Sequence, residues 1–382
     1  MTSDANLRMT VALLRRFLSF RCFFLVAPLA AIVSCSARAQ DDYPIRAMID
    51  GTIDGSDVVE GTNFSSLDGS DLFWQETITK LGTKYIRLHF AEFQNPSSEY
   101  FELTIKNSRG DIVVKYSHET LPDVDFWTPM IVGQDALIQV RATTVPQALT
   151  FKLDKVAYQT SGGWWKSIIG DPEFEPIIGY RDDPEITRAA MAVAKLTYFD
   201  GDFKSCTGFL IGRNRMMTNH HCISRQEVCE TAMAIFGFQE DEQGNVQIGE
   251  QYACENVVKQ DYNHDCAVLE LRNDPGDEWG SLEFTTTPLT IGQGIYIVQH
   301  PDGGPKQISK TNCRVLDVEV DGRAANTDFT HECDTLGGSS GSPVMTVDHK
   351  VIGLHHYGIN QETYWDRNRA VRSQLILEHL AQ

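Results

Sequence analysis

Three short segments in the second half of the chain carry side chains of the types that nucleophilic hydrolysis requires. They are SCTGFLIGRNRMMTNHHC (205–222), DYNHDCAVLEL (261–271) and CDTLGGSSGSPV (333–344). In this order they supply a histidine beside a cysteine, an aspartate before an apolar run, and serines in a glycine-rich turn. A serine hydroxyl is a poor nucleophile until an imidazole takes its proton, and a carboxylate must orient that imidazole and stabilise its charge. The three segments together therefore predict a serine nucleophile with its base and orienting acid.

The same segments resemble sequence motifs of trypsin-like serine proteases. CTGFLI…MTNHHC resembles CGGSLI…LTAAHC, HDCAVLEL resembles NDIALLKL, and GSSGSP overlays GDSGGP without a gap. The resemblance implies that His221 is the general base, Asp265 the orienting carboxylate and Ser340 the nucleophile. His220 would then lie beside the base as a supporting residue. Asp261 is a rival for the carboxylate role, although no apolar strand follows it directly.

The resemblance also implies an oxyanion hole made by the backbone N–H groups of Gly338 and Ser340. Such donors stabilise the charge that develops on the carbonyl oxygen in the transition state. A glycine at position 338 lets the backbone adopt the conformation that aims its N–H at this oxygen.

The cysteines indicate an oxidising compartment. Two of the nine, Cys22 and Cys35, lie in the first 39 residues, and the other seven all lie in the second half. Seven is odd, so we expect three disulfides and one free thiol. The resemblance pairs Cys206 with Cys222 and leaves Cys266 as the free thiol in the core, while proximity and family likeness pair Cys229 with Cys254 and Cys313 with Cys333. There is no CxxC or HExxH motif, and we expect neither a metal nor another cofactor.

The residues that would determine substrate specificity imply two different preferences. GSSGSPV together with GLHHYG (353–358) resembles bacterial trypsin-like peptidases, including glutamyl endopeptidases, in which a Thr and a His hold an acidic side chain. Thr335 and His355 match those two positions. Asp334, however, lies six residues before Ser340, where trypsin-type enzymes carry the aspartate that attracts Arg or Lys. For the residue before the cut bond, we expect a preference for basic over acidic side chains.

The start of the matched region raises the question of activation. IIGY (177–180) resembles the mature N-terminus of trypsins, which pairs with an aspartate next to the nucleophile. Ser339 stands in place of that aspartate, so we expect activation without this ion pair.

The elements that must position these residues are almost all strands. From about residue 43 to 158, segments such as YIRLHFAEF (85–93) and YFELTIK (100–106) alternate apolar and polar residues between turns. This pattern predicts an accessory β-sandwich of jelly-roll or CUB-like type over residues 40–158. A linker follows at 159–176. For residues 177–382 the resemblance implies a chymotrypsin-like double β-barrel with a closing helix at about 370–380, so the whole chain is all-β.

The N-terminus and the charge indicate an exported protein. Residues 1–39 have arginines before an apolar run and end in ARA, the pattern of a cleaved signal peptide. An alternative is a lipid anchor at Cys35, because IVSC resembles a lipobox. The chain carries a formal charge of −19, and removing five Arg and one Asp with residues 1–39 gives −19 − 4 = −23. Such an acidic chain argues against nucleic acid as a partner.

The sequence therefore predicts a secreted or periplasmic serine endopeptidase whose partner is a protein or peptide substrate. A second reading is an extracellular binding protein, with a degenerate protease domain and a sandwich that recognises a surface or glycan. Degeneration of this kind would remove a catalytic residue, whereas all three are in place.

Overall fold

The computed structural model describes residues 47–49, 59–60, 71–83, 85–95, 100–122, 125–144, 149–159, 166–167, 172–359 and 367–381. The expected signal segment 1–39 and the alternative anchor at Cys35 lie outside these residues. In the part of the chain that is described, no helix is long and apolar enough to cross a membrane.

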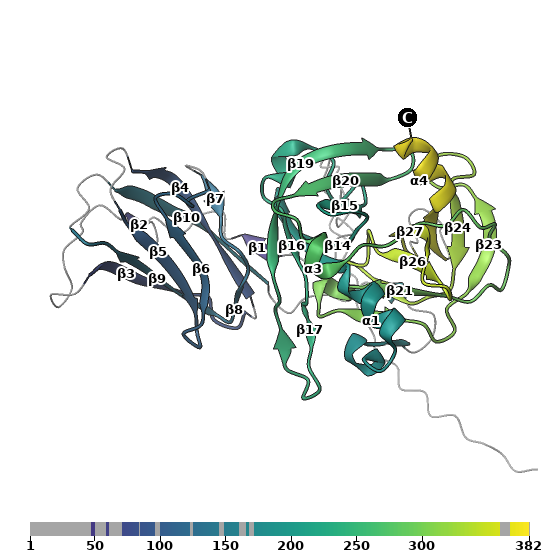
Figure 1. Ribbon diagram of the computed structural model, residues 1–382, viewed down its shortest axis with the longest axis horizontal. Coiled ribbons are helices and arrows are strands. Elements are labelled where there is room, and N and C mark those ends of the chain that lie inside the picture. The colour runs from purple at the N-terminus through teal and green to yellow at the C-terminus, as the bar shows by residue number, and fades with distance from the viewer. Residues whose placement is uncertain are drawn as a thin grey trace, which may run out of the picture. The chain divides into compact units, whose positions relative to one another are not determined.

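The strands before residue 160 form two sheets around one apolar core (Figure 1). One sheet has the order β3 (Leu72–Thr79), β9 (Asp135–Arg141), β5 (Glu102–Asn107) and β6 (Ile112–Ser117). The other sheet pairs β4 (Tyr85–Gln94) with β10 (Thr150–Gln159), and adds β1 (Ala47–Ile49), β2 (Val59–Glu60), β7 (Phe126–Trp127) and β8 (Ile131–Val132). Buried side chains of both sheets meet, among them Phe90, Phe93, Leu103 and Ile138. The jelly-roll or CUB-like class of this segment stays a prediction.

The first barrel contains the strands that follow residue 192. They are β13 (Val193–Asp200), β14 (Asp202–Leu210), β15 (Arg215–Thr218), β16 (Met233–Ile235), β19 (Gln251–Asp261) and β20 (Cys266–Leu271). The order β13-β16-β19-β20-β15-β14 is closed by the pairing of β13 with β14, which removes both sheet edges. Strand β13 is buried along most of its length, as expected for a strand that faces the core and a second layer.

The second barrel is a curled sheet of eight strands. Its order is β12 (Phe174–Pro176), β22 (Gln307–Ser309), β21 (Ile295–Gln299), β26 (Pro343–Thr346), β27 (Val351–Tyr357), β28 (Asn368–Arg372), β24 (Asp328–His331) and β23 (Val315–Val320). The two-stranded sheets β11 (Lys166–Ser167) with β25 (Thr335–Leu336) and β17 (Gln239–Glu240) with β18 (Val246–Gln247) complete the strands. This all-β architecture is the predicted double β-barrel. One apolar core cluster, from Ile177 to Ile376, contains residues of both halves, and a further cluster that includes Ile297 and Phe329 lies in the second barrel.

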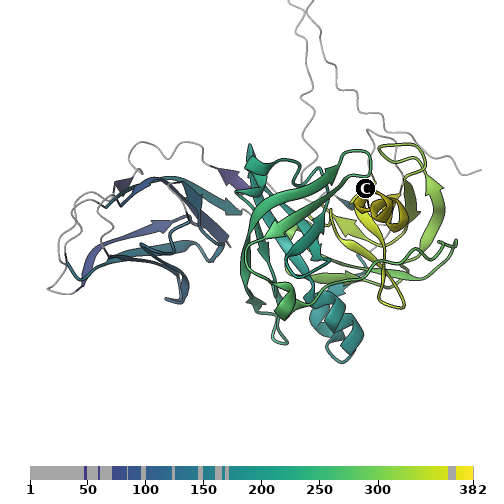
Figure 2. The same ribbon diagram turned by 45° about the horizontal axis from the view of Figure 1, so that its top comes forward.

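Six short helices occur in the described residues. They are η1 (Ile177–Tyr180), α1 (Pro184–Met191), α2 (Gln226–Cys229), α3 (Gly276–Trp279), η2 (Pro301–Gly303) and α4 (Ser373–Leu380). Helix α4 packs against β27 and β28, and Figure 2 shows it in yellow in front of the yellow strands. The predicted helix at 370–380 begins too early, because residues 370–372 continue β28 and pair with β24 and β27.

Candidate active site

His221 and Asp265 lie in contact at one end of the first barrel. His221 follows β15, and Asp265 ends the turn that precedes β20. The imidazole Nδ1 lies 2.7 Å from Asp265 Oδ2, and the backbone N–H of His221 donates to Oδ1 at 2.9 Å. Asp265 is fully buried. The rival Asp261 instead contacts His264 and His379, so the structure brings Asp265 and not Asp261 to His221.

The carboxylate of Asp265 stays ionised although it is buried. Burial alone raises the pKa of a carboxyl group, because it penalises the charged form. The charge of His221 and hydrogen bonds from His221 and His356 outweigh this effect and hold the pKa of Asp265 well below its ordinary range. The residue adopts a positive φ of 42°.

Ser340 lies in the turn between β25 and β26, within the second barrel. Its hydroxyl donates to the backbone oxygen of His356 at 3.3 Å. The first barrel supports this turn through Thr207 of β14, whose N–H donates to the Ser340 carbonyl and whose Oγ1 donates to the Gly338 carbonyl, both at 2.8 Å. His221 and Asp265 therefore come from the first barrel and Ser340 from the second, and both Ser340 and Asp265 contact His356.

Glycine is required at position 338. Its φ is +90°, and a Cβ there would lie 2.7 Å from both the Gly303 N and the His300 O. Within the described part of the chain, neither the Gly338 N–H nor the Ser340 N–H donates a hydrogen bond. Both predicted oxyanion donors are thus left available.

His356 is a further residue of the site that the sequence did not single out. Its Nδ1 lies 3.1 Å from Asp265 Oδ2, and its Nε2 lies 2.7 Å from Asp328 Oδ2. All three side chains are fully buried. Burial disfavours the charged imidazole, but Asp328 and Asp265 more than compensate and raise the pKa of His356 to about 9. His356 is therefore an imidazolium at neutral pH, held between two carboxylates.

Arg323 is a second missed residue that contacts the same carboxylate. Its Nη1 lies 3.2 Å from Asp265 Oδ1, and its Nε donates to the Tyr357 hydroxyl at 2.6 Å. The Tyr357 ring stacks on the His221 ring with centroids 5.6 Å apart. The Nδ1 atom of His220, a residue expected beside the base, lies 3.5 Å from Arg323 Nη1. Arg323 occurs in the segment VDGRAANTD, which contains no motif that would have indicated this role.

The three expected specificity residues have polar partners inside the protein. The Asp334 carboxylate accepts the backbone N–H of Glu173 at 2.9 Å. Thr335 Oγ1 donates to Asn368 Oδ1 at 3.1 Å, and His355 Nδ1 lies 3.2 Å from His331 Nε2. All three are buried. Thr335 and His355 thus both adjoin β28, whereas Asp334 is held by the residue that directly precedes β12.

The histidine pair is uncharged at neutral pH. Burial, with the nearby charge of His356, lowers the pKa of His331 to about 3. Burial and the neighbouring histidines hold the pKa of His355 well below its ordinary value. A neutral imidazole at 355 can present one N–H or one lone pair to a partner.

The region around Ser339 does not form the ion pair of the trypsin zymogen switch. Ser339 is fully buried, and its hydroxyl accepts the Leu336 N–H at 3.2 Å. The backbone N–H of Ile177 donates to the Lys306 carbonyl at 3.3 Å within the continuous chain.

The structure forms the three expected disulfides and leaves Cys266 as a buried free thiol. The bonds are Cys206–Cys222, Cys229–Cys254 and Cys313–Cys333. The first bond ties β14 to the segment that carries His221. Cys206, His221 and Cys222 lie close enough to suggest a metal site, but the two sulfurs are bonded to each other and cannot act as thiolate ligands. Burial raises the pKa of Cys266 to about 12, so this thiol is inert.

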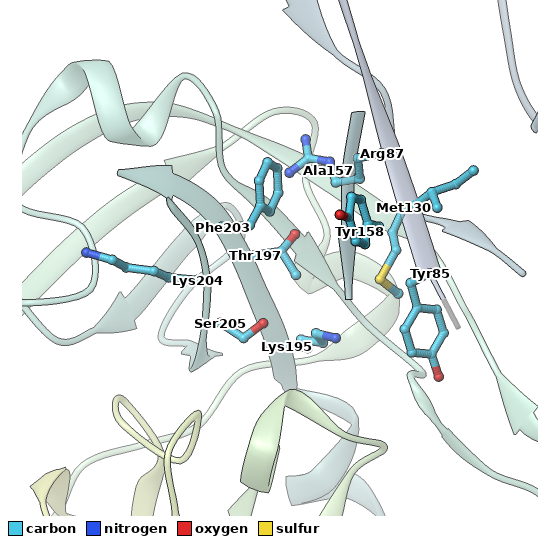
Figure 3. Close-up of a pocket in the computed structure, with 11 residues that line it drawn as sticks. Tyr85, Arg87, Met130, Ala157, Tyr158, Lys195, Thr197, Phe203, Lys204 and Ser205 are labelled. Atoms are coloured by element: carbon cyan, nitrogen blue, oxygen red, sulfur yellow. The ribbon is translucent and has the colours of Figure 1, made fainter. Parts of the chain in front are cut away.

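A pocket in the structure lies apart from these residues. Its lining includes Tyr85, Arg87, Lys195 and Phe203 and contains none of the three expected catalytic residues (Figure 3). Lys195 is buried over aromatic rings, with Nζ 4.6 Å from the ring centroid of Phe238, and burial lowers its pKa to about 7. The pocket is therefore not the place where the expected hydrolysis would occur.

Part of the chain is similar to known proteins. Residues 206–354 match the family model described as a trypsin-like peptidase domain. Secreted RxLR effector protein 73 of Plasmopara viticola is 25% identical over 321 residues, which are 74% of this chain and 76% of that protein. Glutamyl endopeptidase of Staphylococcus epidermidis is 23% identical over 169 residues, 43% of this chain and 57% of that protein. The active form of the Rv3671c protease from M. tuberculosis is a similar solved structure, with 19% identity and a TM-score of 0.41 over 56% of this chain and 91% of that one.

The matched residues begin at Cys206 and contain His221, Asp265 and Ser340, with the contacts described above. This chain carries a trypsin-like peptidase domain.

Proposed function

We propose that this protein is a serine endopeptidase in which Ser340 attacks the peptide carbonyl, His221 accepts its proton and Asp265 orients His221. The observation that carries the proposal is the double contact of Asp265 with His221, at 2.7 Å to the ring and 2.9 Å to the backbone N–H. This contact occupies Nδ1 and leaves Nε2 to take the proton, which is the tautomer that such catalysis requires.

The reaction would proceed in two acyl transfers. Ser340 Oγ bonds to the carbonyl carbon while its proton passes to His221, and the N–H groups of Gly338 and Ser340 stabilise the oxyanion. His221 then gives the proton to the leaving amine as the C–N bond breaks. Water attacks the resulting ester, its proton passes to His221, and Ser340 leaves with that proton. The Ser340 hydroxyl now donates to the His356 carbonyl, and contacts of this kind commonly realign only when substrate binds.

We further propose that Thr335 and His355 select the residue before the cut bond, and that they favour an acidic side chain there. The basic preference that Asp334 implied is less well supported, because the Asp334 carboxylate accepts the Glu173 N–H at 2.9 Å. A neutral His355 can donate an N–H to a carboxylate, and Thr335 adds a hydroxyl. The name of the relative glutamyl endopeptidase agrees with this proposal.

We propose that the protein acts outside the cytoplasm, either secreted or periplasmic, with a lipid anchor at Cys35 as the alternative. Three disulfides are typical of proteins from an oxidising compartment, and the name of one relative includes the word "secreted". The surface or glycan ligand of residues 40–158 stays a prediction from the sequence.

Cleavage of a mixed-sequence peptide library by the mature protein tests the proposal. We expect Ser340→Ala to lower kcat by about 10⁶, as in other Ser-His-Asp enzymes. Ser342→Ala is the matched control, because Ser342 lies in the same turn and its buried hydroxyl has no hydrogen-bond partner among the described residues. The control should retain activity and cut at the same sites.

The library also decides between the two readings of the chain. Cuts that persist in Ser340→Ala, or the absence of any cut by the parent, would refute the peptidase and favour the binding protein. Cuts after Glu or Asp would support Thr335 and His355, and cuts after Arg or Lys would restore Asp334 as the selecting residue.

A further inference from the structure

A second cluster of reactive side chains lies on the far side of the turn that carries Asp265. Asp261 ends β19, His264 lies in the turn before β20, and His379 lies in the last turn of α4. Asp261 Oδ2 is 3.2 Å from His264 Nδ1 and 3.2 Å from His379 Nδ1. The three side chains are 18%, 23% and 19% exposed, so solvent ions can reach them. We call these three residues the Asp261 cluster.

The turn itself orients the carboxylate of the cluster. Asp261 Oδ1 accepts the backbone N–H groups of Asn263 at 2.6 Å and His264 at 3.0 Å. These bonds fix the side chain so that Oδ2 faces both imidazole rings.

The distances within the cluster fit metal ligands as well as long hydrogen bonds. A charge-assisted N–H···O bond is about 2.7–2.9 Å long, and His221 and Asp265 in this protein lie 2.7 Å apart. Ligands that sit about 2.0–2.1 Å from a tetrahedral zinc are roughly 3.3–3.4 Å from one another. Both imidazole–carboxylate distances in the Asp261 cluster are 3.2 Å, close to that tetrahedral edge.

The surrounding charges are compatible with a bound cation. The carbonyl end of a helix carries partial negative charge, and His379 lies in the last turn of α4. Among the described residues, Lys259 Nζ donates to the Leu380 carbonyl at 3.5 Å and Arg323 Nη1 donates to the Tyr262 carbonyl at 3.3 Å, so both cations have oxygen partners of their own. Two imidazoles and one carboxylate with an open fourth position form a donor set that favours zinc over calcium or magnesium.

We propose that Asp261, His264 and His379 bind one zinc ion that joins the C-terminal helix α4 to the turn ending at Asp265. His264 directly precedes Asp265, and the Asp265 N–H donates to the Tyr262 carbonyl at 3.2 Å inside the same turn. An ion bound here would restrain this turn through His264, the neighbour of Asp265, while His221 contacts Asp265 itself.

Calorimetric titration of the mature Ser340→Ala chain with zinc chloride, after removal of metals with a chelator, tests the proposal. This inactive background prevents self-digestion and makes the result independent of peptidase activity. We expect one equivalent to bind, and the melting temperature to rise by several degrees at about a hundredfold excess over Kd. Asp261→Asn should weaken binding by at least about tenfold, because it removes the charge but keeps an oxygen for the Asn263 and His264 N–H groups.

His379→Gln should also lose the zinc-dependent rise in melting temperature. The matched control is His118→Gln, since His118 is another partly exposed histidine beside a carboxylate, Glu119, and belongs to the N-terminal strands. The control should bind zinc as the parent does. Absence of binding by the parent, or equal binding by the parent, Asp261→Asn and His379→Gln, would overturn the proposal and leave the cluster as a hydrogen-bonded trio.

Discussion

The buried imidazolium of His356 gives the sharpest test of how this site is held together. His356→Gln removes the positive charge between Asp265 Oδ2, 3.1 Å away, and Asp328 Oδ2, 2.7 Å away. Asp265 keeps its contacts with His221 and Arg323. Asp328 keeps a 2.9 Å hydrogen bond from the Thr327 hydroxyl and loses the charge that compensates its own.

The expected cost of this substitution is large. Removing one partner of a fully buried ion pair destabilises a protein by about 3–5 kcal/mol, because the other charge is left buried without compensation. Asp328→Asn alone leaves His356 with Asp265, so it should cost less. In the double variant the unpaired carboxylate at 328 is absent. We therefore expect His356→Gln/Asp328→Asn to be more stable than the sum of the single effects by about 1–3 kcal/mol.

The pH dependence of stability provides a second reading of the same interaction. The pKa of His356 rises from 6.5 to about 9 on folding, so the folded protein holds this proton more tightly than the unfolded chain. The resulting stability is complete below pH 6.5 and is lost as pH rises through about 9. In this window the slope contributed by one group is at most about 1.4 kcal/mol per pH unit. His356→Gln should remove this contribution.

Urea denaturation of the four proteins in the Ser340→Ala background, at several pH values between 6 and 9.5, measures both quantities. Additivity of the two substitutions within about 0.5 kcal/mol would mean that His356 and Asp328 are not coupled. An unchanged pH dependence in His356→Gln would mean that this histidine is neutral in the folded protein. Either result would refute the description of His356 as an imidazolium between two carboxylates.

Two substitutions test the remaining parts of the site. Gly338→Ala should lower kcat by about 10²–10³, because its Cβ would force the turn away from Gly303 and displace one oxyanion donor. The control for backbone strain is Gly244→Ala, since Gly244 has a φ of +77° and nothing within 4 Å of a Cβ. This control should keep peptidase activity. Asp334→Asn should leave the preferred cleavage residue unchanged in a peptide library and lower the free energy of unfolding by about 1 kcal/mol, since its amide can still accept the Glu173 N–H but without charge assistance. A normal kcat in Gly338→Ala, or a loss of cleavage after basic residues in Asp334→Asn, would contradict these roles.

The catalytic residues proposed from the sequence lie in short contiguous motifs. Ser340 was recognisable because its turn needs glycine at 338, where φ is +90° and a Cβ has no room. His221 was recognisable because the disulfide partner Cys222 follows it directly. In both places the local covalent and steric requirements fall on adjacent residues, so a short motif is sufficient to identify the position.

The residues that the sequence missed depend on contacts between distant segments. His356 and Asp328 are 28 residues apart and meet because β27 and β24 both pair with β28. The position of Asp334 six residues before Ser340 suggested a role in the substrate pocket, but gave no sign of its hydrogen-bond partner Glu173, which is 161 residues earlier in the chain. The spacing of residues along the chain does not predict such contacts, because they depend on the order of the strands in the sheet.

The donors around Asp265 explain why the proton taken from Ser340 should remain on His221. A carboxylate has about four lone-pair sites, and four N–H-bearing groups approach Asp265. The His221 backbone and Arg323 are at Oδ1, and the His221 ring and His356 are at Oδ2. Each of them stabilises the ionised form, which agrees with the strongly lowered pKa of Asp265. An acid whose oxygens are filled in this way is a poor proton acceptor, so it can orient the imidazole and stabilise its charge without taking the proton itself.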